Sequence, residues 1–259
     1  MNKKTRSNYI NSPSPIKQEL RMLFEANALL TIFDIGSCEG EDSIRYSRLF
    51  PNAKVFAFEP LPSNVKMLKL QLDRYGAKNV NVFQLALSDA IGDSDFYVSS
   101  GQKDPRVSKE DWDFGNKSSS LLPPHANNRE LFPWLEFSEK IKVSTDTLEH
   151  FCSLQGVRQI DFVHLDVQGG ELKVLSGAGS LINQITSVWM EVEKTPLYED
   201  QPLQHEIENF MKMQGFVKLK DTVSGFAGDQ FYVNSAYLWK HPLIALKFAV
   251  KRFSKKKHA

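Results

Sequence analysis

The sequence predicts an α/β protein built on a mostly parallel β-sheet. Short apolar runs, which are typical of strands buried on both faces, alternate with amphipathic segments of helical spacing. The run at residues 32–35 leads through a glycine loop and one helical segment to a second run at residues 55–58. Two parallel strands joined by a crossover helix place a ligand outside the carboxyl ends of the strands. The residues that follow each apolar run are therefore the candidates for ligand binding.

The first such segment is the loop at residues 36–40, which follows Asp34. Gly36 and Gly40 carry no Cβ atom and allow the backbone to turn tightly and to approach a ligand closely. Glu59 ends the second run about 20 residues after the loop, which is the usual position of the acid that accepts hydrogen bonds from ribose hydroxyls. The spacing of the loop and Glu59 predicts a nucleoside-binding site.

The loop favours a nucleoside that lacks a pyrophosphate. Cys38 stands where the dinucleotide-binding pattern G-x-G-x-x-G has its second glycine, and no G-x-x-x-x-G-K-[ST] pattern occurs. S-adenosylmethionine therefore fits better than NAD, and a dinucleotide oxidoreductase is the disfavoured alternative. A purely structural interpretation makes Asp34 a turn cap and Glu59 a solvated strand end. It explains either acid alone, but it explains the spaced pair less well.

The elements after residue 60 continue the alternation. Residues 62–75 have helical spacing, and a strand at 80–85 delivers Ala86 and Leu87 to the same sheet edge. Gly92 and Asp93 predict a hairpin turn into a strand at residues 95–98. We expect further elements in the order helix through residue 152, strand 160–166 with a following helix, strand 187–193, helix 204–213, and closing antiparallel strands at 216–220 and 229–234.

Asp166 ends the predicted strand at 160–166 and shares one face of it with His164. A carboxylate at this edge can hold an amino group of the ligand, orient a substrate hydroxyl or bind a metal ion. The structural alternative is a helix-capping acid, since aspartate is favoured at that position. His164 has the better unperturbed pKa for a general base, but a buried strand favours a structural histidine.

Composition excludes several classes of protein. Hydrophobic residues make up 41% and charged residues 24% of the chain, as in ordinary globular proteins. The net charge of +1 divides into a mildly acidic body and a basic end, so no nucleic acid partner is expected. Only Cys38 and Cys152 occur, which argues against a disulfide framework and favours a reducing, cytoplasmic compartment. We find no secretory signal and no run of about 18 apolar residues that could span a bilayer.

Three regions are predicted. Residues 1–30 form a polar, mobile arm up to residue 14 and then a helix, residues 31–237 form the main domain, and residues 238–259 form a tail. Within the main domain, residues 99–140 are long and polar but rich in aromatic side chains, which favours a lid over a linker. His125 lies in this segment and is a weak catalytic candidate, because a lone loop histidine is more often solvated.

Several motifs together resemble the FkbM-type S-adenosylmethionine-dependent methyltransferases. They are FDIGSCEG, FAFEPLPSN, LALSD, STDTL, DFVHLDVQGGELKVLSGA and EVEKTPLYEDQPL, and they cover roughly residues 32–233. The resemblance implies a class I (Rossmann-like) methyltransferase fold, with a seven-stranded, mostly parallel sheet, helices on both faces and a final antiparallel hairpin. It also implies O-methylation of a hydroxyl on a sugar, glycan or related small molecule.

The same resemblance assigns the site residues. Asp166 would face the transferred methyl group and, with His164, is a catalytic candidate. Family members often have Ala-Asn at positions 37–38 and a lysine at 164, so the acceptor and the general base stay open. A divalent metal, held by Asp166, Glu191 and Glu193, is not favoured. The cofactor-binding residues implied by the motifs are Asp34, Gly36, Ser37, Gly40, Glu59, Pro60, Leu61, Ala86, Leu87 and Asp166.

The tail predicts a basic amphipathic helix. Such a helix binds membrane surfaces, and the equal alternative is a helix docked on the sheet with a solvated charged end. Membrane contact would suit a lipid-linked acceptor at the inner face of the membrane. The alternative function is a non-catalytic adenosine-binding or membrane-associated scaffold of the same fold. Apolar residues on one side are Leu243, Leu246, Val250 and Phe253, and basic residues on another are Lys247, Lys251 and Lys255.

Overall fold

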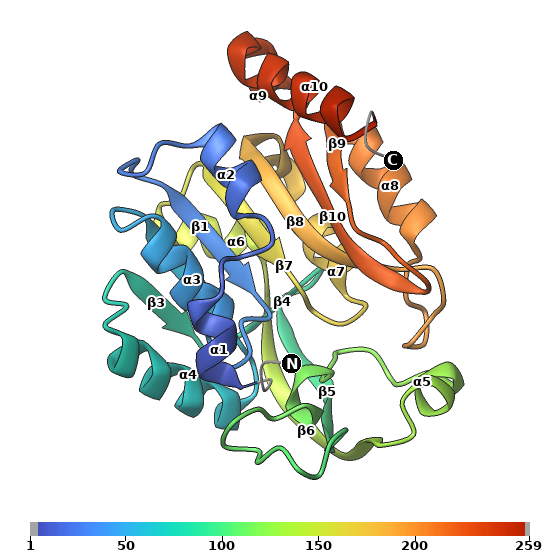
Figure 1. Ribbon diagram of the computed structural model, residues 1–259. Helices are drawn as coiled ribbons and strands as arrows, with labels where there is room; N and C mark the ends of the chain where they lie inside the picture. Colours follow the sequence, from blue (N-terminus) through green and yellow to red (C-terminus); the bar gives the residue numbers. More distant parts are fainter. Residues whose placement is uncertain (1–4, 257–259) are drawn as a thin grey trace.

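A seven-stranded sheet forms the centre of the protein, whose computed structural model describes residues 5–256, the last five by their backbone alone (Figure 1). Its strand order is β3-β2-β1-β7-β8-β10-β9, and β10 alone runs opposite to the other six strands. This confirms the predicted class I methyltransferase fold. The strands are β1 (Thr31–Ile35), β2 (Lys54–Phe58), β3 (Val80–Phe83), β7 (Ile160–Leu165), β8 (Ile185–Glu193), β9 (Phe216–Asp221) and β10 (Ala227–Asn234).

Helices cover both faces of this sheet (Figure 1). Side chains of α6, α7 and α8 pack on one face, and those of α2, α3 and α10 pack on the other. The helices are α1 (Arg6–Asn11), α2 (Lys17–Leu23), α3 (Glu41–Leu49), α4 (Pro62–Tyr75), α5 (Ala126–Leu131), α6 (Leu148–Gln155), α7 (Glu171–Ser176), α8 (Gln204–Met213), α9 (Ser235–Lys240) and α10 (Pro242–Lys256), with 3-10 turns η1 (Gly115–Lys117) and η2 (Gly179–Gln184).

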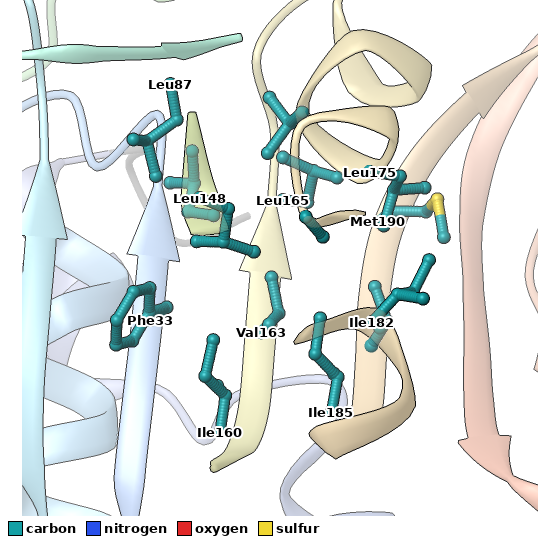
Figure 2. Close-up of a cluster of buried hydrophobic side chains, with 14 of the residues drawn as sticks. Phe33, Leu87, Leu148, Ile160, Val163, Leu165, Leu175, Ile182, Ile185 and Met190 are labelled. Carbon is teal, nitrogen blue, oxygen red and sulfur yellow. The ribbon is translucent and has the colours of Figure 1, made fainter. Parts of the chain in front are cut away.

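Burial on both faces explains the uninterrupted apolar runs in the sequence. Figure 2 shows Phe33 and Val163, from neighbouring strands, packed with Leu148 of α6 and Leu175 of α7. Each such side chain contributes about 1.5–3 kcal/mol when it is removed from water. Packing of this kind on both faces fixes the register of β1 against its neighbours, and the register fixes where the strands end.

A second, three-stranded sheet takes in the two ends of the predicted lid. It consists of β4 (Ala86–Ser88), β6 (Leu135–Thr147) and β5 (Gly92–Gly101), in that order across the sheet. The segment 99–140 was predicted as one lid-like excursion, and this is wrong at both ends, where β5 and β6 pair along their length. The excursion that remains, residues 102–134, holds η1 and α5 and leaves the sheet at paired positions.

The N-terminal arm also differs from the prediction. Residues 6–11 form α1 instead of a mobile segment, because Thr5 caps the helix and the side chains of Arg6 and Ile10 are buried. Arg6 donates hydrogen bonds to Glu39 of the glycine loop and to the backbone of Glu110 in the excursion. The helix expected at residues 16–28 is shorter, and it ends at Leu23.

The two ends of the sheet carry different structures (Figure 1). The small sheet and the excursion lie at the edge where the parallel strands end, and α9 and α10 lie at the opposite edge. Within residues 5–256, every helix is too short or too polar to cross a membrane.

Candidate active site

The glycine loop is held tightly between three strands. Gly36 has a φ of +84°, and a Cβ atom built there would lie 1.8 Å from the carbonyl oxygen of Asp166. The backbone amides of Gly36 and Ser37 both donate to the carbonyl oxygen of Phe58, at 3.0 and 2.9 Å. Only glycine fits at position 36, since any side chain would collide with the backbone that follows β7.

Glu59 is fixed by backbone amides. Its carboxyl group accepts hydrogen bonds from the backbone N–H of Cys38 at 2.9 Å and of Leu61 at 2.8 Å. The residue is only 5% exposed, and burial raises the pKa of its carboxyl group to about 8 although these hydrogen bonds oppose the shift. Because two backbone amides set its orientation, the carboxyl group has a fixed position beside the glycine loop before any ligand binds.

A cavity lies over the loop, and we call its two sides the strand-end wall and the insertion wall. The strand-end wall includes the predicted residues Gly36, Glu59, Pro60, Ala86, Leu87 and Asp166, together with Cys38 and Gln168. The insertion wall consists of Asn116, Lys117, Ser119 and Leu121.

The character of the lining fits an adenine nucleoside that carries an amino acid. Glu59 follows β2 and Asp166 follows β7, so the two acids flank the loop after β1 on opposite sides. Phe58, Leu85 and Phe96 supply apolar surface to the cavity. For S-adenosylmethionine, Glu59 would accept hydrogen bonds from the ribose hydroxyls, and the apolar side chains would contact the base. When bound, this cofactor supplies an electrophilic methyl group.

The remaining predicted cofactor residues lie behind the cavity and shape the loop. Asp34 accepts hydrogen bonds from the Ser43 hydroxyl and from the Nδ1 atom of His164, which lies 2.8 Å away. Ser37 donates to the Phe58 carbonyl, Gly40 begins α3 with a φ of +86°, and Leu61 is buried. None of these four is among the residues that line the cavity in the described part of the chain.

His164 is held as a cation. Burial opposes its charge, but the hydrogen bond and the negative charge of Asp34 outweigh burial and raise the pKa of His164 to about 9. At neutral pH the imidazole therefore carries a proton and cannot accept another. Its role in this geometry is to pair with Asp34 beneath the loop.

Asp166 belongs to a network of acids at the ends of β7 and β8. The Gln168 side-chain amide donates to Asp166 at 2.7 Å and to Glu191 at 2.8 Å. The Tyr198 hydroxyl lies 3.0 Å from the Gln168 side-chain oxygen and 2.7 Å from the Ser118 carbonyl oxygen. Burial raises the pKa of both Asp166 and Glu191, and their mutual repulsion adds to the shift at Glu191.

Two further carboxyl groups extend this network. Burial raises the pKa of Glu193 to about 9 and that of Glu171 to about 7. Gln201 donates to Glu193 at 2.7 Å. Across the described residues, no three His, Cys, Asp or Glu side chains are grouped so that they could hold a metal ion. The side-chain amides of Gln168 and Gln201 hold three of these acids in place.

The insertion wall is attached to the loop by side chains. The ammonium group of Lys117 lies 2.9 Å from a Glu41 oxygen and 3.6 Å from the Cys38 sulfur. The Asn116 amide donates to Asn64 at 3.1 Å. The cavity volume is about 50 Å³, well below the ~300–1,000 Å³ of pockets that enclose small molecules. S-adenosylmethionine therefore needs more room than this cavity offers in the structure.

Sequence reasoning predicted a lid at residues 99–140, but it did not identify the residues of the insertion wall or the part played by Gln168. Gln168 has a φ of +57°, a conformation that is uncommon outside glycine and is found at functional sites. No local pattern marks Asn116 or Lys117, because their partners are far away in the sequence. His125 caps α5, where its ring accepts a hydrogen bond from the Asn127 amide, and it does not line the cavity.

Comparison with known proteins agrees with this geometry. Residues 34–218 match the family described as the methyltransferase FkbM domain. The 2-O-methyltransferase NoeI of Sinorhizobium fredii is 33% identical over 173 residues, and the match spans 66% of this chain and 66% of NoeI. The methyltransferase sdnD of Sordaria araneosa is 24% identical over 217 residues, which cover 79% of this chain and 80% of sdnD.

Among solved structures, the precorrin-6y C5,15-methyltransferase of Geobacter metallireducens matches with a TM-score of 0.41 and 14% identity, over 86% of this chain and 90% of that chain. The family match covers most of the chain and includes the glycine loop, Glu59 and Asp166. It also removes the dinucleotide oxidoreductase alternative. The chain belongs to the FkbM family of S-adenosylmethionine-dependent methyltransferases.

Proposed function

We propose that the protein transfers a methyl group from S-adenosylmethionine to a hydroxyl group of a sugar, glycan or related small molecule. The observation that carries this proposal is the cavity in which Glu59 and Asp166 flank the glycine loop, on a chain of the FkbM family. The printed name of NoeI, a 2-O-methyltransferase, supports oxygen as the acceptor atom.

Asp166 is the general base in this proposal. Transfer to a hydroxyl group needs alignment, which supplies roughly 7–11 kcal/mol in well-oriented cases, and removal of the hydroxyl proton. Asp166 lines the cavity, and Gln168 holds one of its oxygens. The other oxygen accepts no hydrogen bond from the described residues, so it is free to take a proton. Burial raises the pKa of Asp166 and so strengthens it as a base.

The excursion is the element that selects the acceptor in this proposal. It supplies one wall of the cavity, and its segment around α5 is rich in aromatic side chains, including Phe132 and Trp134. Faces of aromatic rings offer apolar contact to sugar rings. The acceptor in this proposal can be lipid-linked and methylated at the inner face of a membrane. In that case the basic tail would hold the protein at the membrane.

Calorimetry with S-adenosylmethionine, S-adenosylhomocysteine and NAD, each with and without magnesium, tests the cofactor. Micromolar binding of the first two, without NAD binding, is expected. Transfer of a labelled methyl group to a panel of glycans then tests the acceptor. Binding without transfer to any sugar, glycan or small hydroxyl compound would favour the scaffold alternative. Binding of NAD alone would contradict the proposal.

A further inference from the structure

The helices α9 and α10 expose a stripe of large apolar side chains. Leu243, Leu246 and Val250 are 74, 59 and 59% exposed, and their spacing of three and four residues places them on one side of α10. Trp239 of α9 precedes them by four residues and is 84% exposed. Single exposed apolar residues are common on proteins, but three in helical register on α10, close in sequence to the exposed Trp239 of α9, indicate a surface that is covered in use.

The opposite side of these helices is firmly docked. Phe248 is buried, and Tyr237 and Ile244 pack with it against the sheet. The Lys251 ammonium group donates to a Glu19 oxygen at 2.7 Å. The docked interpretation of the tail is therefore confirmed for one side of the helix, and the exposed other side is the one on which membrane binding depends. The side chains of Phe253 and Lys255, which were predicted to extend the pattern, lie outside the described residues.

A basic groove adjoins the exposed stripe. It has a volume of about 400 Å³ and lies between the end of α2 and the junction of α9 with α10. Arg21, Lys240 and Lys247 line it together with His241, and Glu25 is its one acidic residue. The sequence from residue 240 to 259 adds further lysine and arginine and no acid. The groove therefore suits an anionic group beside the apolar stripe.

We infer that this surface binds an anionic phospholipid membrane. The stripe would lie among the acyl chains, and the groove would take a lipid phosphate, a combination that defines interfacial helices. Contact with a second copy of the chain fits less well. A two-fold contact buries the same surface of both copies, so it would bring Lys240 and Lys247 of both copies into one interface in which Glu25 is the one acidic residue of the groove.

The surface and the cavity lie at opposite ends of the sheet (Figure 1). Membrane binding and cofactor binding therefore use separate faces, and each can fail without the other. A protein seated on this surface would hold its cavity away from the bilayer, so a lipid-linked acceptor would need a glycan long enough to reach it.

Co-sedimentation of the full chain with vesicles tests the inference. We expect binding to vesicles that contain phosphatidylglycerol and weak binding to phosphatidylcholine alone. Leu243→Ser, Leu246→Ser and Val250→Ser together should lower binding at least about tenfold. The matched control replaces Leu154 and Met213, which are 66 and 77% exposed elsewhere on the surface, with serine. Lys240→Gln with Lys247→Gln should remove the preference for the anionic lipid.

Calorimetry with S-adenosylhomocysteine on each variant shows that the site is intact, so failure of membrane binding is distinguished from failure of the proposed enzyme activity. A blue shift of Trp239 fluorescence with vesicles, absent in Trp239→Phe, would locate the contact. Equal sedimentation of the triple variant and the parent would overturn the inference. So would a dimer in ultracentrifugation that the triple variant abolishes while the parent ignores vesicles.

Discussion

The two walls of the cofactor cavity are held in place by different kinds of contact. In the strand-end wall, backbone groups hold one another: the Asp166 amide donates to the Ile35 carbonyl at 3.0 Å, and the Glu59 amide donates to the Phe83 carbonyl at 3.1 Å. The insertion wall is joined to the strand-end wall and the glycine loop by side chains. Lys117 reaches Glu41, and the hydroxyl of Ser120, beside the wall, donates to the Gln168 carbonyl at 2.7 Å. Backbone hydrogen bonds tie Ser120 to Tyr97 of the small sheet instead.

The different contacts give the two walls different rigidity. Backbone contacts follow from strand register and change little when a side chain changes, so the strand-end wall has the rigidity that the proposed cofactor site needs. Side-chain contacts depend on particular pairs of residues and can break and reform, which suits a wall that moves. Substitutions in the first wall should therefore abolish a function, whereas those in the second should change a rate of opening.

The largest effect is expected at Asp166 in the strand-end wall. Asp166→Asn keeps the size of the side chain but cannot take a proton, so methyl transfer should slow by about 10²–10⁴-fold. Single-turnover rates at saturating cofactor measure this change. Glu191→Gln is the matched control, since Glu191 contacts the same Gln168 amide but does not line the cavity. Equal losses in both variants would argue against a base at position 166.

Glu59→Ala should weaken S-adenosylhomocysteine binding by about 100-fold, because the hydrogen bonds from the two ribose hydroxyls to this carboxyl group are lost. Calorimetry measures the affinity, and circular dichroism checks that the fold is unchanged. Unaltered affinity in a folded variant would remove the ribose assignment of Glu59.

The raised pKa of Glu59 predicts a dependence of stability on pH. The folded carboxyl group keeps its proton up to about pH 8, whereas the unfolded one loses it above its ordinary value of 4.5. Through this group, the free energy of unfolding should fall by about 1.4 kcal/mol per pH unit as the pH rises between those values. Denaturant titrations of the parent and of Glu59→Gln measure the slope, which should be shallower in the variant. Parallel curves would contradict the shift.

The smallest effect is expected in the insertion wall. Lys117→Met removes the ion pair with Glu41 and should speed both proteolytic cleavage of residues 102–134 and dissociation of S-adenosylhomocysteine, each by about tenfold or less. Stopped-flow dissociation and timed proteolysis report the two rates. Lys109→Met, at an exposed lysine of the same segment, is the control and should behave like the parent.

The residues of the strand-end wall could be predicted because short stretches of sequence determine their positions. Apolar runs define the strands, parallel strands end at one edge, and whatever follows them meets there, as Gly36, Glu59 and Asp166 do. The insertion wall depends on pairs such as Lys117 and Glu41, which are 76 residues apart and leave no local pattern. Asp34 is an intermediate case. Its position at the end of a strand was predicted from the sequence, but its contacts with Ser43 and His164 could be identified only in the structure.

The sequence analysis did not predict the strand β6 or the helix α1, and features of the sequence explain both failures. In β6, Phe137, Ile141 and Val143 stand at odd positions among charged residues, a period of two that indicates a half-exposed strand. The high charge of the segment favoured a loop instead. The helix α1 has six residues and no apolar periodicity, so tertiary contacts of Arg6 and Ile10 decide its structure.

The excursion leaves and re-enters the small sheet at Gly101 and Leu135, which are partners across β5 and β6. Because the two ends of this segment are neighbours, its length and sequence can change without displacing the strands β5 and β6 from which it extends. The entropy of closing such a loop grows only slowly with its length. Under the proposed function, specificity for the acceptor would diversify at residues 102–134 while the strand-end wall stays constant, and grafting this segment between relatives would be a direct route to new acceptors.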